Sequence, residues 1–415
     1  MTMRGGVHTD ADFAKYAESG AGPRLRVLHV SAYFAPAFRY GGPPRSVLGL
    51  SQALVRAGVD VEVFTTTANG DDPLPPAPDG VDYQGVRARY FPLAWPRRYW
   101  RAAGLAEALD RAVTGADLVH VHGLWNFTAW AGVRAARAVG VPYVISPRGM
   151  FQPDGMARHH ALKMIAYWAA ERRHLQGAAF LHATSDAEAR SLSSVGPRVA
   201  IIANGVESRT ATPAQIADVR QRFGLPDDAA VITFVGRLHP IKRLDLLAGA
   251  FTRLRREGRQ AYLVVAGPDE GGHRRQIEPL FLEVADRVRW TGAVEGDAKW
   301  ALLATSRAVV QCSSSESFGL SVAEALGAGV PVVVTDRGAW AAVSSVGCGE
   351  LVAHDAAAIA AALGRLLDRP DEARAMGERG RAWVRRAFGW DGIGRAMRRE
   401  YDALVSRGDS VRQAG

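Results

Sequence analysis

The chain contains few cysteines and no long apolar run, and both scarcities exclude classes of protein. Two cysteines, Cys312 and Cys348, occur among 415 residues, too few for a disulfide framework or a structural zinc site. We expect buried free thiols in a reducing compartment. No segment has the roughly 18 consecutive apolar residues that a transmembrane helix needs. The polar N-terminus lacks the apolar segment of a signal peptide, so we predict a cytoplasmic protein.

Lysine is also rare, although the chain carries a formal net charge of +9. Arginine supplies nearly all of the positive charge, because lysine occurs only at Lys15, Lys163, Lys242 and Lys299. A basic balance favours anionic partners such as nucleotides, nucleic acid or anionic lipid. An arginine-rich composition without a specific partner is the alternative interpretation.

Strands alternate with helical stretches in two successive series. Short apolar runs predict strands at residues 25–30, 59–64, 117–121, 142–146, 180–184, 199–202, 230–235, 262–266, 288–291, 308–311 and 331–335. Such alternation builds parallel sheets with helices on both faces. We therefore predict an α/β fold with two doubly wound Rossmann-like domains facing a central cleft, where strand ends and helix N-termini bind ligands.

This pattern divides the chain into four segments. We predict a flexible N-terminal tail at residues 1–23, a first domain at residues 24–206 and a second at residues 207–388, after a polar linking stretch. The last helical stretch is interrupted near Gly389, because glycine weakens a helix interior. We expect residues 389–415 to form a C-terminal helix that crosses back toward the first domain.

The dinucleotide fingerprint Gly-x-Gly-x-x-Gly does not follow the first strand, which disfavours nicotinamide and flavin cofactors. Gly41 and Gly42 lie there instead, before a helix predicted to begin near Pro44. Glycine permits close approach of the backbone to a diphosphate, and the helix dipole favours negative charge. A plain turn is the alternative.

Two glutamates, Glu316 and Glu324, lie eight residues apart across a strand-end loop and a predicted helix start. The residues between them, including Phe318, Gly319 and Leu320, present backbone N–H groups suited to phosphate or a sugar hydroxyl. Carboxylates at both ends can accept hydrogen bonds from two hydroxyl-bearing rings. An ordinary capping arrangement, with Glu324 solvated, is the alternative, and the pair alone favours it.

A basic motif follows the first strand of the second series. It comprises Gly236, Arg237 and Leu238, with Lys242 a few residues later. The arginine fork can bind two phosphate oxygens, and the lysine can place a point charge on the same group. A solvated basic loop is the alternative.

Histidines and an arginine end two strands of the first series. His120 and His122 point to the same strand face, and His122 is nearer the cleft. A structural histidine satisfied by hydrogen bonds is the alternative. A histidine pair at this spacing can bind metal, but we expect no third ligand nearby and predict no metal site. Arg148 follows the next strand, where it can meet an anionic acceptor group.

Two stretches mix basic and aromatic residues. This combination suits a membrane interface with anionic lipid, or single-stranded nucleic acid. A partly buried surface with solvated arginines is the alternative. The first cluster is Arg87, Arg89, Tyr90, Phe91, Trp95, Arg97, Arg98, Tyr99, Trp100 and Arg101, and the second is Arg158, His159, His160, Lys163, Tyr167, Trp168, Arg172 and Arg173.

Together these motifs resemble the family-four retaining glycosyltransferases of the glycosyltransferase B fold, over most of the chain from Arg24 onward. The glutamate pair, the Gly-Arg-Leu and lysine motif and the glycine pair are the main points of similarity. Residues 146–150, 204–206, 266–272 and 324–332 are similar to a bacterial branch that builds surface polysaccharides and related glycosides. Arg243 departs from the pattern, since many relatives have glycine there, which puts the local loop shape in doubt.

The resemblance implies a role for each motif. Glu316 would contact donor-sugar hydroxyls, and Glu324 would hold the ribose. Arg237 and Lys242 would neutralise the leaving diphosphate, so that no metal and no other cofactor is needed. Phe318, Gly319 and Leu320 would offer backbone amides, and Gly41 and Gly42 would complete the donor site. His122 would reach the donor sugar, and Arg148 would lie on the acceptor side, in the first domain.

The implied reaction moves a hexosyl unit from a nucleoside-diphosphate sugar to an acceptor hydroxyl with retained configuration, in polysaccharide or glycoconjugate biosynthesis. A uridine or guanosine donor and a sugar acceptor, free or lipid-linked, are expected, with no nucleic-acid partner. The basic-aromatic clusters are consistent with peripheral contact at the inner membrane face. The alternatives are a nucleotide-sugar epimerase or hydrolase of the same fold, and a non-catalytic nucleotide- or lipid-binding protein.

Overall fold

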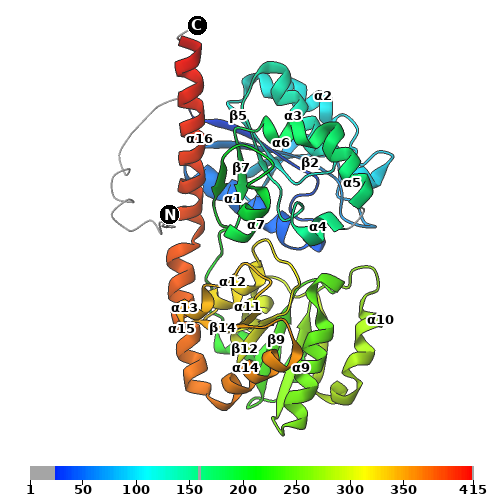
Figure 1. The fold of residues 1–415 in the computed structure, drawn as a ribbon, viewed down its shortest axis with the longest axis vertical. Helices are drawn as coiled ribbons and strands as arrows, with labels where there is room; N and C mark the ends of the chain where they lie inside the picture. Colours follow the sequence, from blue (N-terminus) through cyan, green and yellow to red (C-terminus); the bar gives the residue numbers. More distant parts are fainter. Residues whose placement is uncertain (1–23, 158–159, 414–415) are drawn as a thin grey trace.

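The computed structural model describes residues 24–157 and 160–413. The predicted tail at residues 1–23 and the basic residues Arg158 and His159 therefore lie outside the described residues. Within them, the chain forms two α/β halves, one above the other in Figure 1, with a long C-terminal helix beside the upper half. No helix among the described residues is long and apolar enough to cross a membrane.

The first half is built on an eight-stranded sheet in the order β3-β4-β2-β1-β5-β6-β7-β8. Every neighbouring pair is parallel except β3 and β4. The central strands are apolar and buried, as expected for strands covered on both faces. The strands are β1 (Arg26–Ser31), β2 (Asp60–Thr66), β3 (Ala77–Tyr83), β4 (Val86–Phe91), β5 (Leu118–His122), β6 (Tyr143–Ser146), β7 (Phe180–Ala183) and β8 (Val199–Ile201).

The helices of this half begin and end at residues that suit those positions. Asn126 caps the start of α3 by accepting a hydrogen bond from Ala129, and Gly140 ends α3 in the left-handed conformation. The helices are α1 (Gly42–Arg56), α2 (Leu105–Ala112), α3 (Phe127–Val139), α4 (Pro153–Ala157), α5 (His160–Ala166), a π-helical turn (Tyr167–Glu171), α6 (Arg172–Gln176) and α7 (Asp186–Leu192).

The second half is built on a parallel six-stranded sheet in the order β11-β10-β9-β12-β13-β14. Its strands are β9 (Ala230–Val235), β10 (Ala261–Ala266), β11 (Val288–Gly292), β12 (Ala308–Gln311), β13 (Val332–Thr335) and β14 (Gly349–Val352). Its helices are α8 (Pro213–Arg222), α9 (Leu244–Arg256), α10 (Arg274–Ile277), α11 (Gly296–Thr305), α12 (Leu320–Gly327), α13 (Val343–Val346), α14 (Ala356–Asp368) and α15 (Pro370–Ala387). The predicted fold class of two doubly wound domains is thus confirmed.

A final helix, α16 (Trp390–Gln413), runs along the first half, whereas α15 lies beside the second (Figure 1). Glycines allow this contact, because a Cβ atom at Gly49 or Gly205 would lie 2.1 or 2.2 Å from the Trp390 ring. Farther along α16, the Tyr401 side chain is fully buried in the first half. The C-terminal helix therefore contributes to the core of the first half.

The first basic-aromatic cluster is a partly buried surface, because Tyr90 and Phe91 are buried on β4. Its arginines are not all solvated, since Arg87 and Arg89 both bind the buried carboxylate of Glu62.

In the second basic-aromatic stretch, residues 160–176 are continuously helical, through α5, the π-helical turn and α6. Leu162, Ile165 and Trp168 on this helix are exposed, with Trp168 61% accessible.

Candidate active site

The carboxyl ends of both sheets face a cavity of about 370 Å³ between the halves. This volume is in the range typical of small-molecule sites, about 300–1,000 Å³. His122 does not line this cavity; it lines a smaller neighbouring one, and Arg148 lies on both. The predicted residues that line the large cavity are Gly41, Gly42, Arg148, Arg237, Lys242, Glu316, Phe318, Gly319, Leu320 and Glu324.

The glutamate nearer β12 is held by the basic motif. Glu316 Oε2 lies 2.5 Å from Lys242 Nζ, and both side chains are largely buried. Lys242 ends the short 3₁₀ helix Pro240–Lys242 that follows β9, whereas Glu316 follows β12, the strand next to β9 in the sheet. A charge pair in a partly buried place interacts more strongly than one in water. The two motifs found separately in the sequence therefore form one electrostatic unit.

The second glutamate has a lysine of its own. Glu324, on α12, lies 2.5 Å from Lys299 Nζ on α11, and both side chains are more than four-fifths buried. Lys299 was not predicted as a site residue. Two of the chain's four lysines thus neutralise the two motif glutamates, and the rarity of lysine was a sign that could have identified Lys299.

Arg237 is also paired with a carboxylate that was not predicted. Its guanidinium lies 2.5 Å from Glu270, in the loop after β10. Gly267 in that loop packs against the backbone of Gly236, so tightly that a Cβ atom would lie 1.8 Å from the Gly236 carbonyl oxygen. The two loops therefore fix Arg237 at the cavity wall.

The loop between the glutamates is anchored from behind. Phe318 is buried and packs against Trp340 and Phe388, and Trp340 Nε1 donates a hydrogen bond to the Phe318 carbonyl oxygen. Gly319 precedes α12 in the left-handed conformation, at φ +80°. The first-turn N–H groups of α12 are consequently held at the cavity, where a helix N-terminus favours an anion.

The glycine pair touches the opposite half. A Cβ atom at Gly41 would lie 3.0 Å from Arg237 Nε, and one at Gly42 would lie 3.2 Å from Leu320. An ion pair of 2.6 Å between Arg45 and Glu295 also spans the cleft. The halves therefore meet across the cavity through the start of α1, and side chains at the glycine positions would narrow the site.

Arg243, the departure from the family pattern, adopts the conformation that glycine favours. Its backbone is left-handed, at φ +49°, and it stands between the 3₁₀ turn and α9. The neighbouring Asp245 stabilises it through guanidinium hydrogen bonds of 2.9, 3.2 and 2.7 Å. The loop keeps its turn despite the missing glycine, and Lys242 remains directed at Glu316.

Histidines of the first half form a chain of hydrogen bonds in which each donor and each acceptor can be assigned. His182 Nε2 can only donate to the Ile202 carbonyl, 2.8 Å away, so its Nδ1 accepts from Ser146. Ser146 in turn accepts from His120 Nε2, and His120 Nδ1 accepts from the Tyr401 hydroxyl on α16. Burial lowers the pKa of His182 to about 3 and that of His120 well below its usual value. These rings are neutral at pH 7.

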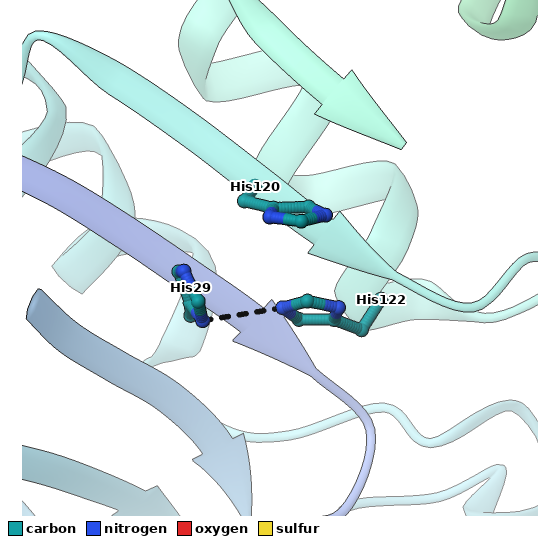
Figure 2. Close-up of side chains that lie close together, drawn as sticks. All are labelled: His29, His120 and His122. Atoms are coloured by element: carbon teal, nitrogen blue, oxygen red, sulfur yellow. Dashed lines mark hydrogen bonds between the residues drawn. The ribbon is translucent and has the colours of Figure 1, made fainter. Parts of the chain in front are cut away.

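His122 continues the network toward Arg148. The guanidinium donates to His122 Nδ1 over 3.1 Å, which leaves Nε2 protonated and donating to His29 Nδ1 over 3.2 Å. Figure 2 shows His29 on β1 facing His122 on β5. Burial, with the nearby His120 and Arg148, lowers the pKa of His122 well below its usual value. Both ring nitrogens of His122 are therefore engaged, and neither is free to bind a ligand.

The expectation that no third histidine lies nearby is wrong. His29, His120 and His122 bring ligand nitrogens within 4.8 Å of one another (Figure 2). The lone pairs are already used, however, since His120 Nδ1 accepts from Tyr401 and His122 Nδ1 accepts from Arg148. The trio contains no carboxylate, and the fixed charge of Arg148 would repel a metal cation. This cluster is better suited to holding Arg148 than to holding a metal.

The buried histidines should make the fold acid-sensitive. Each has an ordinary pKa near 6.5 when unfolded, and for His29 and His182 the folded value is about 3. Because the unfolded state binds these protons more readily, stability is complete above pH 6.5 and falls as the pH drops toward 3. The expected loss is up to about 1.4 kcal/mol per pH unit for each histidine.

Urea unfolding at several pH values between 7.5 and 5.5 measures the slope of the free energy of unfolding against pH. The variant His182→Asn should show a shallower slope than the native chain, whereas the exposed His160→Asn should show the same slope. Equal slopes in all three proteins would contradict the conclusion that His182 is neutral in the folded protein.

The fold and the cavity define a class of protein, with two Rossmann-like domains and a ligand-sized cavity between them. The chain matches the glycosyl transferase 4-like domain over residues 41–205 and the glycosyl transferases group 1 family over residues 215–383. It belongs to the family-four glycosyltransferases of the glycosyltransferase B fold.

Named relatives and solved structures agree with this membership. The chain is 34% identical to a D-inositol 3-phosphate glycosyltransferase of Kineococcus radiotolerans, over 88% of this chain and 91% of the relative. It is 30% identical to the Nocardioides sp. protein of the same name, over 90% and 89%. Its fold is similar to sucrose-phosphate synthase from Thermosynechococcus elongatus (TM-score 0.75, 23% identity, 92% and 100% coverage) and to Anabaena HepE in complex with UDP-glucose (TM-score 0.73, 18% identity, 92% and 100% coverage).

Proposed function

We propose that the protein is a retaining hexosyltransferase that uses a nucleoside-diphosphate sugar. The observation that carries this proposal is the convergence, on one cavity, of two cations and a helix N-terminus flanked by two glutamates. Arg237, Lys242 and the first turn of α12 suit a diphosphate, because guanidinium, ammonium and backbone N–H groups all bind phosphate oxygens. Gly41 and Gly42 close the site from the other half.

The two glutamates would divide the rest of the donor. Glu316, beside Lys242, would bind hydroxyls of the transferred sugar, and Glu324, beside Lys299, would bind the ribose hydroxyls. The base is uridine or guanosine. The UDP-glucose complex of the structurally similar HepE supports a uridine donor.

The reaction would break the bond between the sugar C1 and the diphosphate oxygen and form a bond from C1 to the acceptor oxygen on the same face. Negative charge grows on the departing diphosphate, where fixed cations in a closed cleft stabilise it. Arg237 and Lys242 supply the positive charge that stabilises the departing diphosphate, so the transfer needs no metal. The departing phosphate would take the acceptor proton.

Closure of the cleft would protect the donor from water. Contacts between the halves support this step, since Ser185 Oγ donates to the Ser317 carbonyl over 2.6 Å and Arg45 pairs with Glu295. Water exclusion favours transfer over hydrolysis.

The acceptor would bind from the first half, which contains the small cavity and Arg148. The names of the curated relatives support a polyol phosphate as one acceptor. A lipid-linked sugar of polysaccharide or glycoconjugate biosynthesis is the other. For that case, the exposed Leu162, Ile165 and Trp168, with Arg172 over the Trp168 ring, support contact of a cytoplasmic protein with an anionic inner membrane face.

Release of UDP from UDP-glucose, with and without D-inositol 3-phosphate or uncharged inositol, tests the proposal. We expect release that depends on an acceptor, and a product whose anomeric configuration by NMR equals that of the donor. Turnover of the donor without any acceptor, at the same rate, would identify a hydrolase or epimerase instead. Tight UDP binding with no turnover under any condition would identify a binding protein.

A further inference from the structure

Arg148 differs from the other partly buried cations on the large cavity. Arg45, Arg237, Lys242 and Lys299 each form an ion pair with a carboxylate. Arg148 forms none within the described chain, and its hydrogen bonds go to neutral groups, which are Ser46 Oγ at 2.9 Å, Asn204 Oδ1 at 3.2 Å and His122 Nδ1 at 3.1 Å.

The nearest compensating acid is already occupied. Glu188 acts on Arg148 only at a distance, because its oxygens accept hydrogen bonds from Gly149 N at 2.5 Å and from Thr184 N at 2.8 Å. The Nε atom of Arg148 is buried and has no hydrogen-bond partner in the described structure. Burial lowers the pKa of Arg148 to about 10, so it stays charged at pH 7. A buried cation without a counter-ion is costly, and an anionic ligand removes that cost.

The backbone holds this arginine in a strained place. Arg148 is left-handed at φ +53°, a conformation that non-glycine residues seldom adopt, and it directly follows β6. The neutral histidine network holds the guanidinium through its hydrogen bond to His122. Strain and an unpaired charge together at the end of a strand are typical of a binding site rather than of a structural residue.

Aromatic rings lie beside the arginine on the small cavity. Tyr33 and Trp100 line it with Arg148, and their rings meet edge to face with centroids 5.3 Å apart. Tyr40 stacks on the other side of Tyr33, at 4.6 Å. The small cavity has a volume of about 40 Å³, far below the roughly 300 Å³ of a whole small-molecule site, so beside this fixed cation it suits a compact anionic group and not an entire sugar ring.

We propose that Arg148, with Tyr33 and Trp100, forms a subsite for a phosphate group carried by the acceptor. The inference rests on the proposed function and specifies its acceptor as a phosphorylated sugar or polyol. Because Arg148 lies on both cavities, phosphate bound there would fix the acceptor beside the donor sugar near Glu316. The donor diphosphate would bind Arg237 and Lys242, and the acceptor phosphate would bind neither of them.

Calorimetry in two stages tests the subsite. UDP is titrated first, and inorganic phosphate is then titrated into the UDP-saturated protein. In Arg148→Gln, we expect UDP affinity within about twofold of native and phosphate affinity at least tenfold weaker, as for loss of a charge-assisted hydrogen bond. Arg148→Lys keeps the charge without the fork and should be intermediate. Arg134→Gln, which removes an exposed arginine of α3 paired with Asp110, is the matched control and should change neither affinity.

Two results would overturn the proposal. A tenfold loss of UDP affinity in Arg148→Gln would assign the arginine to the donor diphosphate. Unchanged phosphate affinity, in a variant whose near-UV circular dichroism is native, would show that no subsite exists. If Arg148→Gln does not fold, Arg148→Lys decides by the same two criteria. Failure of both UDP and GDP to bind the native protein would instead contradict the proposed function itself, and the first stage, run with each nucleotide, detects that separately.

Discussion

Replacing Lys242 with alanine should lower the turnover number for transfer by about 10²–10³-fold and leave the fold intact. Loss of a single fixed group that stabilises charge in a transition state has an effect of this size. Lys242 lies 2.5 Å from Glu316 on the cavity wall, so its loss also leaves that carboxylate without its partner. Initial rates of UDP release, with saturating donor and acceptor, measure the effect.

The matched control is Lys163→Ala, which removes a lysine of α5 that hydrogen-bonds to the Gly155 carbonyl, away from the cavity. Its turnover should remain within about twofold of native. Full activity of Lys242→Ala would rule out the diphosphate role. Equal losses in both lysine variants would show that general charge or stability, rather than the site, determines the rate.

Changes at the two glutamates should separate chemistry from nucleotide binding. In Glu324→Ala, UDP affinity should fall by about 10–100-fold, because a charged acceptor for ribose hydroxyls is lost and Lys299 is left unpaired. In Glu316→Gln, turnover should fall by about 100-fold, with UDP affinity within about threefold of native, because Glu316 would contact the transferred sugar and UDP has none. Calorimetry with UDP and steady-state kinetics give the two quantities.

Glu278→Ala is the control for this pair, since Glu278 pairs with Arg274 on the surface of the same half. It should change neither quantity. If Glu316→Gln and Glu324→Ala alter the same parameter to the same degree, the division of labour between transferred sugar and ribose is wrong.

The sequence predicts the sheets well because their strands are short apolar runs. Three of the described strands were not predicted. The strand β3 (Ala77–Tyr83) is mostly polar and exposed at the sheet edge, β4 (Val86–Phe91) alternates arginines with apolar residues, and β14 (Gly349–Val352) is short and lies at the edge of the second sheet. The π-helical turn before α6 has no distinctive pattern in the sequence. Elements that depend on pairing with a neighbour, rather than on their own pattern, are the ones that sequence reasoning misses.

Only part of the site could be predicted from the sequence, because some of its residues are placed by strand ends and others by contacts between distant elements. Motif residues such as Arg237 and Glu316 follow strands, and strand ends of a parallel sheet meet at one edge. Their partners lie far away in sequence or on helices, as Lys299 does for Glu324. His29 could have been found, because it lies beside His120 in the register of two predicted strands. Tyr401 could not, because its contact depends on how α16 docks on the first half.

In the proposed function, the donor is held mainly by the second half and the acceptor by the first. The second half contributes the paired charges Arg237, Lys242 and Glu316, whereas the first contributes the unpaired Arg148 and its histidine support. A cation that is paired with a carboxylate suits an anionic ligand that replaces this carboxylate. A cation without a carboxylate partner suits a ligand whose own negative charge becomes the counter-ion. Donor and acceptor affinities should therefore respond to different substitutions.

Thermal unfolding with a panel of nucleoside diphosphates, in the presence of EDTA, tests the central claim most directly. Ligand bound to the folded state raises stability by about 2.7 kcal/mol at one hundred times its dissociation constant. We predict that UDP or GDP raises the unfolding temperature of the native protein without metal, and that the double variant of Arg237→Ala and Lys242→Ala loses the shift. The absence of a shift with every nucleoside diphosphate, or an undiminished shift in the double variant, would contradict the account.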